Sequence, residues 1–124
     1  MANLKMYILV RDDVPLGTAM VAVAHASLAG YLEFQETPEM AEWLSSSFRK
    51  VVCVASAKEF SNAKAVADSV VITESSMGDR EVAIVFKPRA EWPRVLKFAR
   101  RYDRAPNQDE LITFSTGSER RSKS

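Results

Sequence analysis

The chain has 124 residues, 47% hydrophobic and 27% charged, which fits one globular domain and excludes a disordered or fibrous protein. The formal net charge is only +1, but it is unevenly placed. Residues 87–104 carry seven Lys or Arg and two Asp or Glu, whereas residues 1–86 carry seven and eleven. Such a basic zone predicts contact with a polyanion better than the net charge does.

The single cysteine, Cys53, lies in the apolar run VVCVA. One cysteine excludes a disulfide within the chain and a zinc site built from cysteines, and a buried thiol is the simplest interpretation. No apolar run reaches the roughly 20 residues that cross a bilayer. The first residues also lack the pattern of a secretory signal, so we expect a cytoplasmic protein without a membrane segment.

The first predicted strand, residues 6–11 (MYILVR), is apolar on both faces, which is typical of a buried strand. Asp12 and Asp13 follow it, and Pro15 can occupy the first turn of a helix. That helix runs to residue 31, is rich in alanine and valine, and meets no charge before Glu33. We therefore predict that it is buried nearly all round.

The rest of the chain alternates between the two kinds of element. Helices are predicted at 38–48, 57–69 and 91–102, and strands at 49–56, 69–74 and 81–86. A short connection makes the last two strands an antiparallel hairpin, and the helical crossovers favour parallel first, second and third strands. We predict an α/β fold, a single domain at 1–104 with a small four-stranded mixed sheet, helices on both faces and the order β α α β α β β α. A polar tail follows at 105–124.

Several polar side chains gather where the predicted strands end. In an open α/β sheet, ligands bind beyond the carboxyl ends of the parallel strands. Thr18 and His25 are seven residues apart, about two helical turns, so they share a face on which alanines leave room for a ligand. Asp13 and Glu74 end strands at the same edge. The predicted catalytic constellation is Asp13, Thr18, His25 and Glu74.

Each of these residues also has a structural interpretation. His25, the only histidine, can be a hydrogen-bonded core group, and Thr18 can bond to the backbone of the first helical turn. Asp13 can offset the helix dipole, and Glu74 can simply be solvated at a turn. The chain has no GxSxG, GxGxxG or Walker motif. One histidine without a cysteine cluster argues against a metal site, and no cofactor or metal is predicted.

The basic zone carries a second signal. Its residues recur at spacings of three and four, which would align them on one face of the last predicted helix: Arg94, Lys97, Arg101 and Arg104. Such a strip can bind RNA phosphates with salt-dependent affinity and little sequence preference. Alternatively, the charges form only a solvated face while Val95 and Phe98 point into the core.

The segment KMYILVRDDVPLGTAMVAVAHASLAGY, residues 5–31, resembles the opening of type II peptidyl-tRNA hydrolases, where a K-M-x-x-V-V-R-x-D strand leads through a glycine turn into a helix with S-H-A-A. SFRKVVCVASAKEF is similar to the family's second strand and following helix, and VVITESSMGDREVAIVFKPRAEW to its closing hairpin. The similarity covers residues 4–102 and is nearest to the divergent peptidyl-tRNA hydrolase domain-containing branch. It implies a four-stranded mixed sheet, tRNA or peptidyl-tRNA as partner, and hydrolysis of the peptide–tRNA ester without a metal.

In typical members of this family a lysine at the start of the first helix, an aspartate after the third strand and nearby threonines form the site. Aligning the H-A motif on His25 puts Thr18 at the lysine and leaves Glu74 as the nearest counterpart of the aspartate. Three functions remain open. They are a peptidyl-tRNA hydrolase-like esterase, an inactive descendant that binds RNA or a small ligand, and a structural protein that forms a homodimer.

Overall fold

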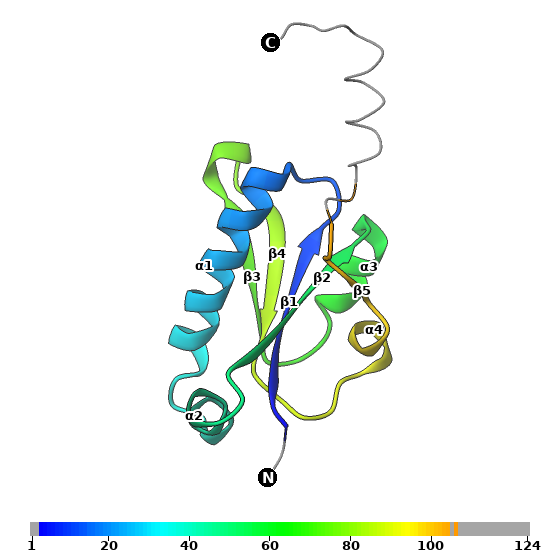
Figure 1. The fold of residues 1–124 in the computed structure, drawn as a ribbon. Helices are drawn as coiled ribbons and strands as arrows, with labels where there is room; N and C mark the ends of the chain where they lie inside the picture. The colour runs from blue at the N-terminus through cyan, green and yellow to red at the C-terminus, as the bar shows by residue number, and fades with distance from the viewer. Residues whose placement is uncertain (1–2, 105, 107–124) are drawn as a thin grey trace, which may run out of the picture.

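The computed structural model describes residues 3–104 and 106 (Figure 1). These residues contain a mixed five-stranded sheet. The strands are β1 (Lys5–Arg11), β2 (Arg49–Ala55), β3 (Ser69–Glu74), β4 (Arg80–Phe86) and β5 (Arg100–Arg101). The helices are α1 (Leu16–Phe34), α2 (Pro38–Ser45), α3 (Ala57–Ala63) and α4 (Arg94–Lys97), and a 3₁₀ turn, η1, spans Ser75–Met77. The predicted order is confirmed, with one further strand at its end. Apart from Pro106, the predicted tail lies outside the described residues.

The strands lie side by side in the order β3-β4-β1-β2-β5. β1 pairs with β2 in parallel, from Lys5 opposite Arg49 to Arg11 opposite Ala55, and β4 is antiparallel to both β1 and β3. The first three strands therefore run in one direction, and β3 and β4 form a hairpin, as predicted. The central position of β1 explains why its sequence is apolar on both faces.

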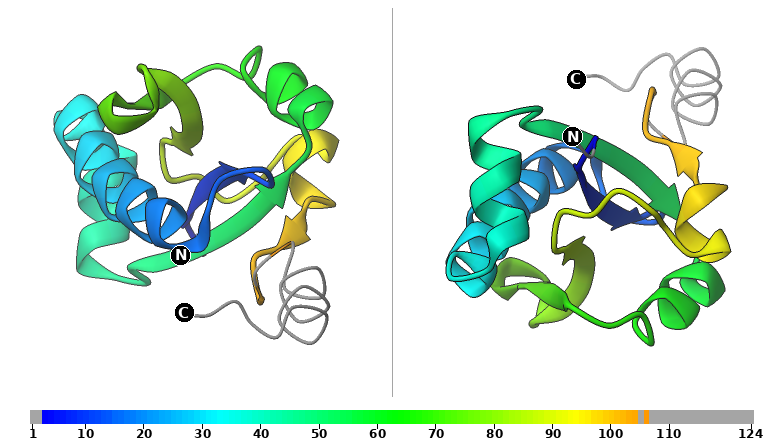
Figure 2. Two further views of the ribbon diagram at one scale, coloured as in Figure 1. Left: turned by 90° about the horizontal axis from the view of Figure 1, so that it is seen from above. Right: turned by 90° about the horizontal axis from the view of Figure 1, so that it is seen from below.

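Alternation along β1 supplies the two faces of the sheet. Met6, Ile8 and Val10 belong to a core shared with α1 and α2, whereas Tyr7 and Leu9 belong to a core shared with α3 and α4. Figure 2 shows this arrangement, with α1 and α2 on one side of the sheet and α3 with α4 on the other. Helices cover both faces, as predicted.

The prediction that α1 is buried nearly all round is wrong. Its buried residues are mostly small: Ala19, Ala22, Ala26, Gly30 and Phe34. At Gly30 the helix approaches β4 closely, because an added Cβ would lie 2.8 Å from Val85 Cγ2. The outer side is apolar but exposed, with Met20 66%, Leu28 60% and Leu32 54% exposed. A largely uncharged helix is thus only half covered here, and its small residues mark the covered half.

The last predicted helix is wrong beyond Lys97. α4 has four residues, and the chain then pairs with the outer edge of β2, where Arg101 lies opposite Cys53. An open strand edge offers a row of unpaired backbone donors and acceptors, and pairing with it replaces the helical turns that local spacing predicts. Phe98 is 68% exposed rather than in the core, and Leu96 occupies the core instead.

Candidate functional site

The carboxyl ends of β1, β2 and β3 meet at one edge of the sheet, and α1 begins at the same edge (Figure 1). The loop 12–15 joins β1 to α1 there, and η1 joins β3 to β4. This is the edge at which open α/β sheets bind their ligands. Each of the four predicted catalytic residues lies on an element that ends or begins at this edge, although His25 is more than two turns along α1.

Glu74 ends β3 and is held by Ser76 of η1, and its carboxylate interacts electrostatically with His25 of α1. The Glu74 carboxylate accepts hydrogen bonds from the Ser76 hydroxyl at 2.9 Å and from the Ser76 backbone N–H at 3.2 Å. These two bonds lower the pKa of Glu74. Burial opposes them, and a weaker electrostatic interaction with His25 also lowers the pKa. The carboxylate is therefore ionised at neutral pH and sits within electrostatic reach of the imidazole.

His25 is exposed, so its interpretation as a buried core histidine is wrong. It stands at a groove of about 450 Å³ between α1 and β3. Apart from His25 and Thr73, the lining is apolar: Leu28, Ala29 and Leu32 from the helix, and Val70, Val71 and Ile72 from the strand. The groove is thus apolar along most of its lining and becomes polar toward the end of β3, where Glu74 lies.

Thr18 is the third residue of α1 and is half-buried on the same side of the helix as His25. Pro15 occupies the cap position without a side-chain hydrogen bond, and the first turn has no acidic residue. Within the described part of the chain, the Thr18 hydroxyl and the backbone N–H groups of Leu16 and Gly17 have no hydrogen-bond partner. A helix start with free donors favours a negative charge in front of it.

Asp13 is engaged in a cluster of its own. Its carboxylate forms ion pairs with Arg11, at 2.8 Å, and with Arg80. Partial burial alone would raise the pKa of Asp13, but hydrogen bonds from Arg80 and Arg11 outweigh it and the pKa is lowered. Arg80 lies directly opposite Glu74 in the β3–β4 ladder. The cluster therefore ties the end of β1 to the start of β4 beside Glu74.

We expect Asp13→Asn to act mainly on stability, lowering the free energy of unfolding by about 1 kcal/mol because partly exposed ion pairs contribute little more. The lowered pKa means that the contribution is present above the ordinary value of 3.8 and is lost as pH falls through the lower folded value. Urea unfolding at neutral pH and at about pH 3 measures both effects, with Asp12→Asn as the control. A large loss of kcat at unchanged stability would instead assign Asp13 to catalysis.

The four basic residues predicted on one helix face do not share one helix. Arg94 and Lys97 are on α4, which covers the face of the sheet opposite α1, while Arg101 is in β5 and Arg104 follows it. The guanidinium of Arg94 and the ammonium of Lys97 stand over the Phe98 ring, 5.6 and 5.8 Å from its centre. A continuous helical strip for phosphates is therefore not formed, because the helix ends at Lys97.

Two residues of the candidate site were missed in the sequence analysis. Arg80 could have been found, because the predicted hairpin has its turn at residues 75–79 and so pairs Arg80 with Glu74. Tyr102 carried no such signal. It belonged to the predicted helix and comes to lie beside α1 only because β5 pairs with β2, where its N–H donates to the Val52 carbonyl at 2.8 Å.

The described residues contain no group of three His, Cys, Asp or Glu side chains that could hold a metal ion. Lys87, another cation of the basic zone, pairs with Glu39 at 3.7 Å and with Asp68 at 3.5 Å. It leaves β4 at the end opposite Arg80 and Glu74, so it does not supply a positive charge to this edge. None of the helices in the described ranges is long and apolar enough to cross a membrane.

The fold agrees with a comparison against known families. The model of the family described as peptidyl-tRNA hydrolase PTH2 matches residues 4–87, more than half of the chain, which covers β1 to β4 and leaves α4 and β5 outside. No curated protein matches the chain. The match supports a peptidyl-tRNA hydrolase-like function with peptidyl-tRNA as substrate, and it lends no support to an inactive descendant. The chain belongs to the peptidyl-tRNA hydrolase PTH2 family.

Proposed function

We propose that the protein hydrolyses the ester between a peptide and the 3′ end of tRNA, with Glu74 activating the attacking water. The observation that carries the proposal is the position of Glu74, held by Ser76, at the same edge of the sheet where the uncapped α1 begins. Family membership supports the substrate class. The edge supports the chemistry, because it offers an ionised carboxylate, a hydroxyl donor and free backbone N–H groups within one region.

In the proposed reaction Glu74 takes a proton from water as the water oxygen attacks the ester carbonyl carbon. The oxyanion of the tetrahedral intermediate then lies against the Thr18 hydroxyl and the first N–H groups of α1. When the bond to the ribose oxygen breaks, the proton returns to that oxygen, which releases free peptide and tRNA. His25 stands at the mouth of the apolar groove, which suits the peptide part of the substrate, and is the alternative base.

The tRNA backbone requires positive charge outside the reacting centre. Arg101 and Arg104 lie at the β5 edge, and Arg94 and Lys97 are further contacts from α4. We assign phosphate binding to these four residues as two separate patches rather than one strip. Such contacts make binding strongly salt-dependent, because each neutralised phosphate releases counterions.

Purified full-length protein and an N-blocked aminoacyl-tRNA test the proposal. We expect release of the blocked amino acid that persists in excess chelator, with a rate that holds on the acid side of neutrality because the pKa of Glu74 is lowered. An imidazole base would instead lose activity below about pH 6.5. The absence of turnover above a protein-free blank between about pH 5 and 9, by protein that is folded, overturns the proposal.

A further inference from the structure

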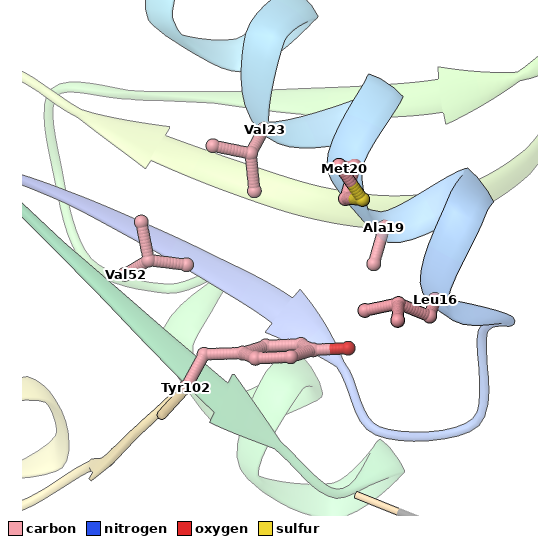
Figure 3. Close-up of a pocket in the computed structure, with 6 residues that line it drawn as sticks. All are labelled: Leu16, Ala19, Met20, Val23, Val52 and Tyr102. Atoms are coloured by element: carbon pink, nitrogen blue, oxygen red, sulfur yellow. The ribbon is translucent and has the colours of Figure 1, made fainter. Parts of the chain in front are cut away.

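A second groove lies between α1 and β2 (Figure 3), on the other side of the helix from the groove that β3 lines. It measures about 350 Å³ and is lined by Leu16, Ala19, Met20, Val23, Val52 and Tyr102. The helix and β2 supply aliphatic side chains, and the Tyr102 ring closes the groove on the side away from α1. The groove begins at the first residue of α1, so it adjoins the proposed reacting centre.

Tyr102 is the one residue of the lining that lies outside residues 4–87, the part that matches the family. Its hydroxyl, directed toward Leu16 in Figure 3, is buried and lacks a hydrogen-bond partner among the described residues. Burial also raises the pKa of Tyr102, so the hydroxyl keeps its proton at neutral pH. An unsatisfied buried hydroxyl costs about 1–3 kcal/mol. The groove therefore holds an unused donor next to the half-exposed Leu16 side chain.

Next to this groove, the outermost strand, β5, and the residues after it are basic. Arg100 lies opposite Val54 in the β2–β5 ladder and is two residues from Tyr102, so the two side chains leave the same face of the sheet. Three arginines line the adjoining depression of about 420 Å³, together with Val54, Asp103 and Pro106: Arg100, Arg101 and Arg104. An apolar groove and a basic depression thus follow each other along one strand pair.

We infer that this edge binds the 3′-terminal nucleotide of the RNA substrate, with the base in the Tyr102 groove and its phosphate on the arginines. A nucleobase stacks on an aromatic ring with about 1–3 kcal/mol, and the free hydroxyl can bond to the base edge. Guanidinium groups bind phosphate through paired hydrogen bonds. A volume of about 350 Å³ is at the small end for ligand sites and suits one planar group.

The charge distinguishes this occupant from an apolar side chain of the peptide, which would fill the groove but leave the arginines unused. The inference rests on the proposed function, since the ester must lie at the start of α1 between the two grooves. In that arrangement the peptide follows the His25 groove and the terminal base enters the Tyr102 groove. The segment after residue 87 thereby adds a recognition element to the family domain.

Equilibrium binding of two fluorescent RNAs to the full-length protein tests the inference without requiring catalysis. One RNA carries the 3′ end of tRNA, whose last nucleotide is an adenosine, and the other lacks that nucleotide. We expect the adenosine to tighten binding at least about tenfold, since one stacked base contributes on that scale. Tyr102→Ala should abolish this gain, Tyr102→Phe should remove part of it, and Arg100→Gln should weaken binding and reduce its salt dependence by about one phosphate contact.

Arg49→Gln is the matched control, because it removes one charge at the opposite end of β2 and should leave both affinities unchanged. Thermal unfolding checks that each variant is folded. Equal affinity for the two RNAs, or a gain retained in Tyr102→Ala, overturns the inference. So does a Tyr102→Ala variant that changes only KM for substrates with a large apolar residue at the ester, and in that case the proposed function stands. RNA binding that depends on the terminal base but is not accompanied by hydrolysis has the opposite meaning. It supports base binding in the groove and contradicts the proposed function.

Discussion

Glu74→Gln is expected to lower kcat for peptidyl-tRNA hydrolysis at least about 100-fold, because a positioned general base contributes roughly 10²–10⁴ to such reactions. The amide cannot take a proton from water at any working pH. Its oxygen can still accept the hydrogen bonds from Ser76, so η1 should keep its conformation and the free energy of unfolding should change little. Single-turnover rates and urea unfolding of the same preparation separate the two effects.

Glu33→Gln controls for the loss of one carboxylate, because Glu33 is exposed near the far end of α1. Ser76→Ala gives an independent check through pH. Its hydroxyl is the largest influence that lowers the pKa of Glu74, so its removal should move the acid limb of the rate profile upward toward the ordinary value of 4.5. Wild-type kcat in Glu74→Gln together with an unmoved acid limb in Ser76→Ala would transfer the role of base to His25.

The elements that were predicted correctly from the sequence are those whose own side-chain pattern is set by their place in the fold. β1 is apolar on both faces from Met6 to Val10 because it lies in the middle of a sheet covered on both faces. The β3–β4 hairpin follows from a short polar connection between two apolar runs. The seven-residue spacing of Thr18 and His25 translates into one side of a helix because helical geometry is local.

The errors arise where a partner distant in the sequence decides the outcome. β5 exists because the outer edge of β2 is open, and nothing in the segment around Arg101 encodes that edge. The exposure of Met20 and Leu28 depends on which side of α1 meets the sheet, and uniform hydrophobicity hides this. In the candidate site, Arg80 had a signal in the hairpin, whereas Tyr102 depends on the unforeseen strand. Local sequence patterns therefore indicated the residues near Glu74 but not those near β5.

Thr18→Val is the second substitution with a large expected effect, and it tests the oxyanion side of the proposed reaction. The two side chains have nearly the same shape, so the change removes a hydroxyl that has no partner among the described residues. We expect kcat to fall about 100-fold, the usual consequence of losing one donor to an oxyanion. The free energy of unfolding should change by less than about 0.5 kcal/mol, because no native hydrogen bond is lost. KM should stay nearly constant, since the donor acts mainly in the transition state.

Thr18→Ser keeps the hydroxyl and should retain most of the rate, whereas Thr18→Lys examines what the threonine replaces. The resemblance to typical members of the family puts a lysine at this position, and an ammonium group stabilises an oxyanion with a full charge rather than a dipole. Thr18→Lys should therefore match or exceed the wild-type kcat. An inactive Thr18→Lys beside an undiminished Thr18→Val would mean that the backbone N–H groups of Leu16 and Gly17 act alone. The free helix start, and not the side chain at position 18, would then be the part of this edge that defines the reaction.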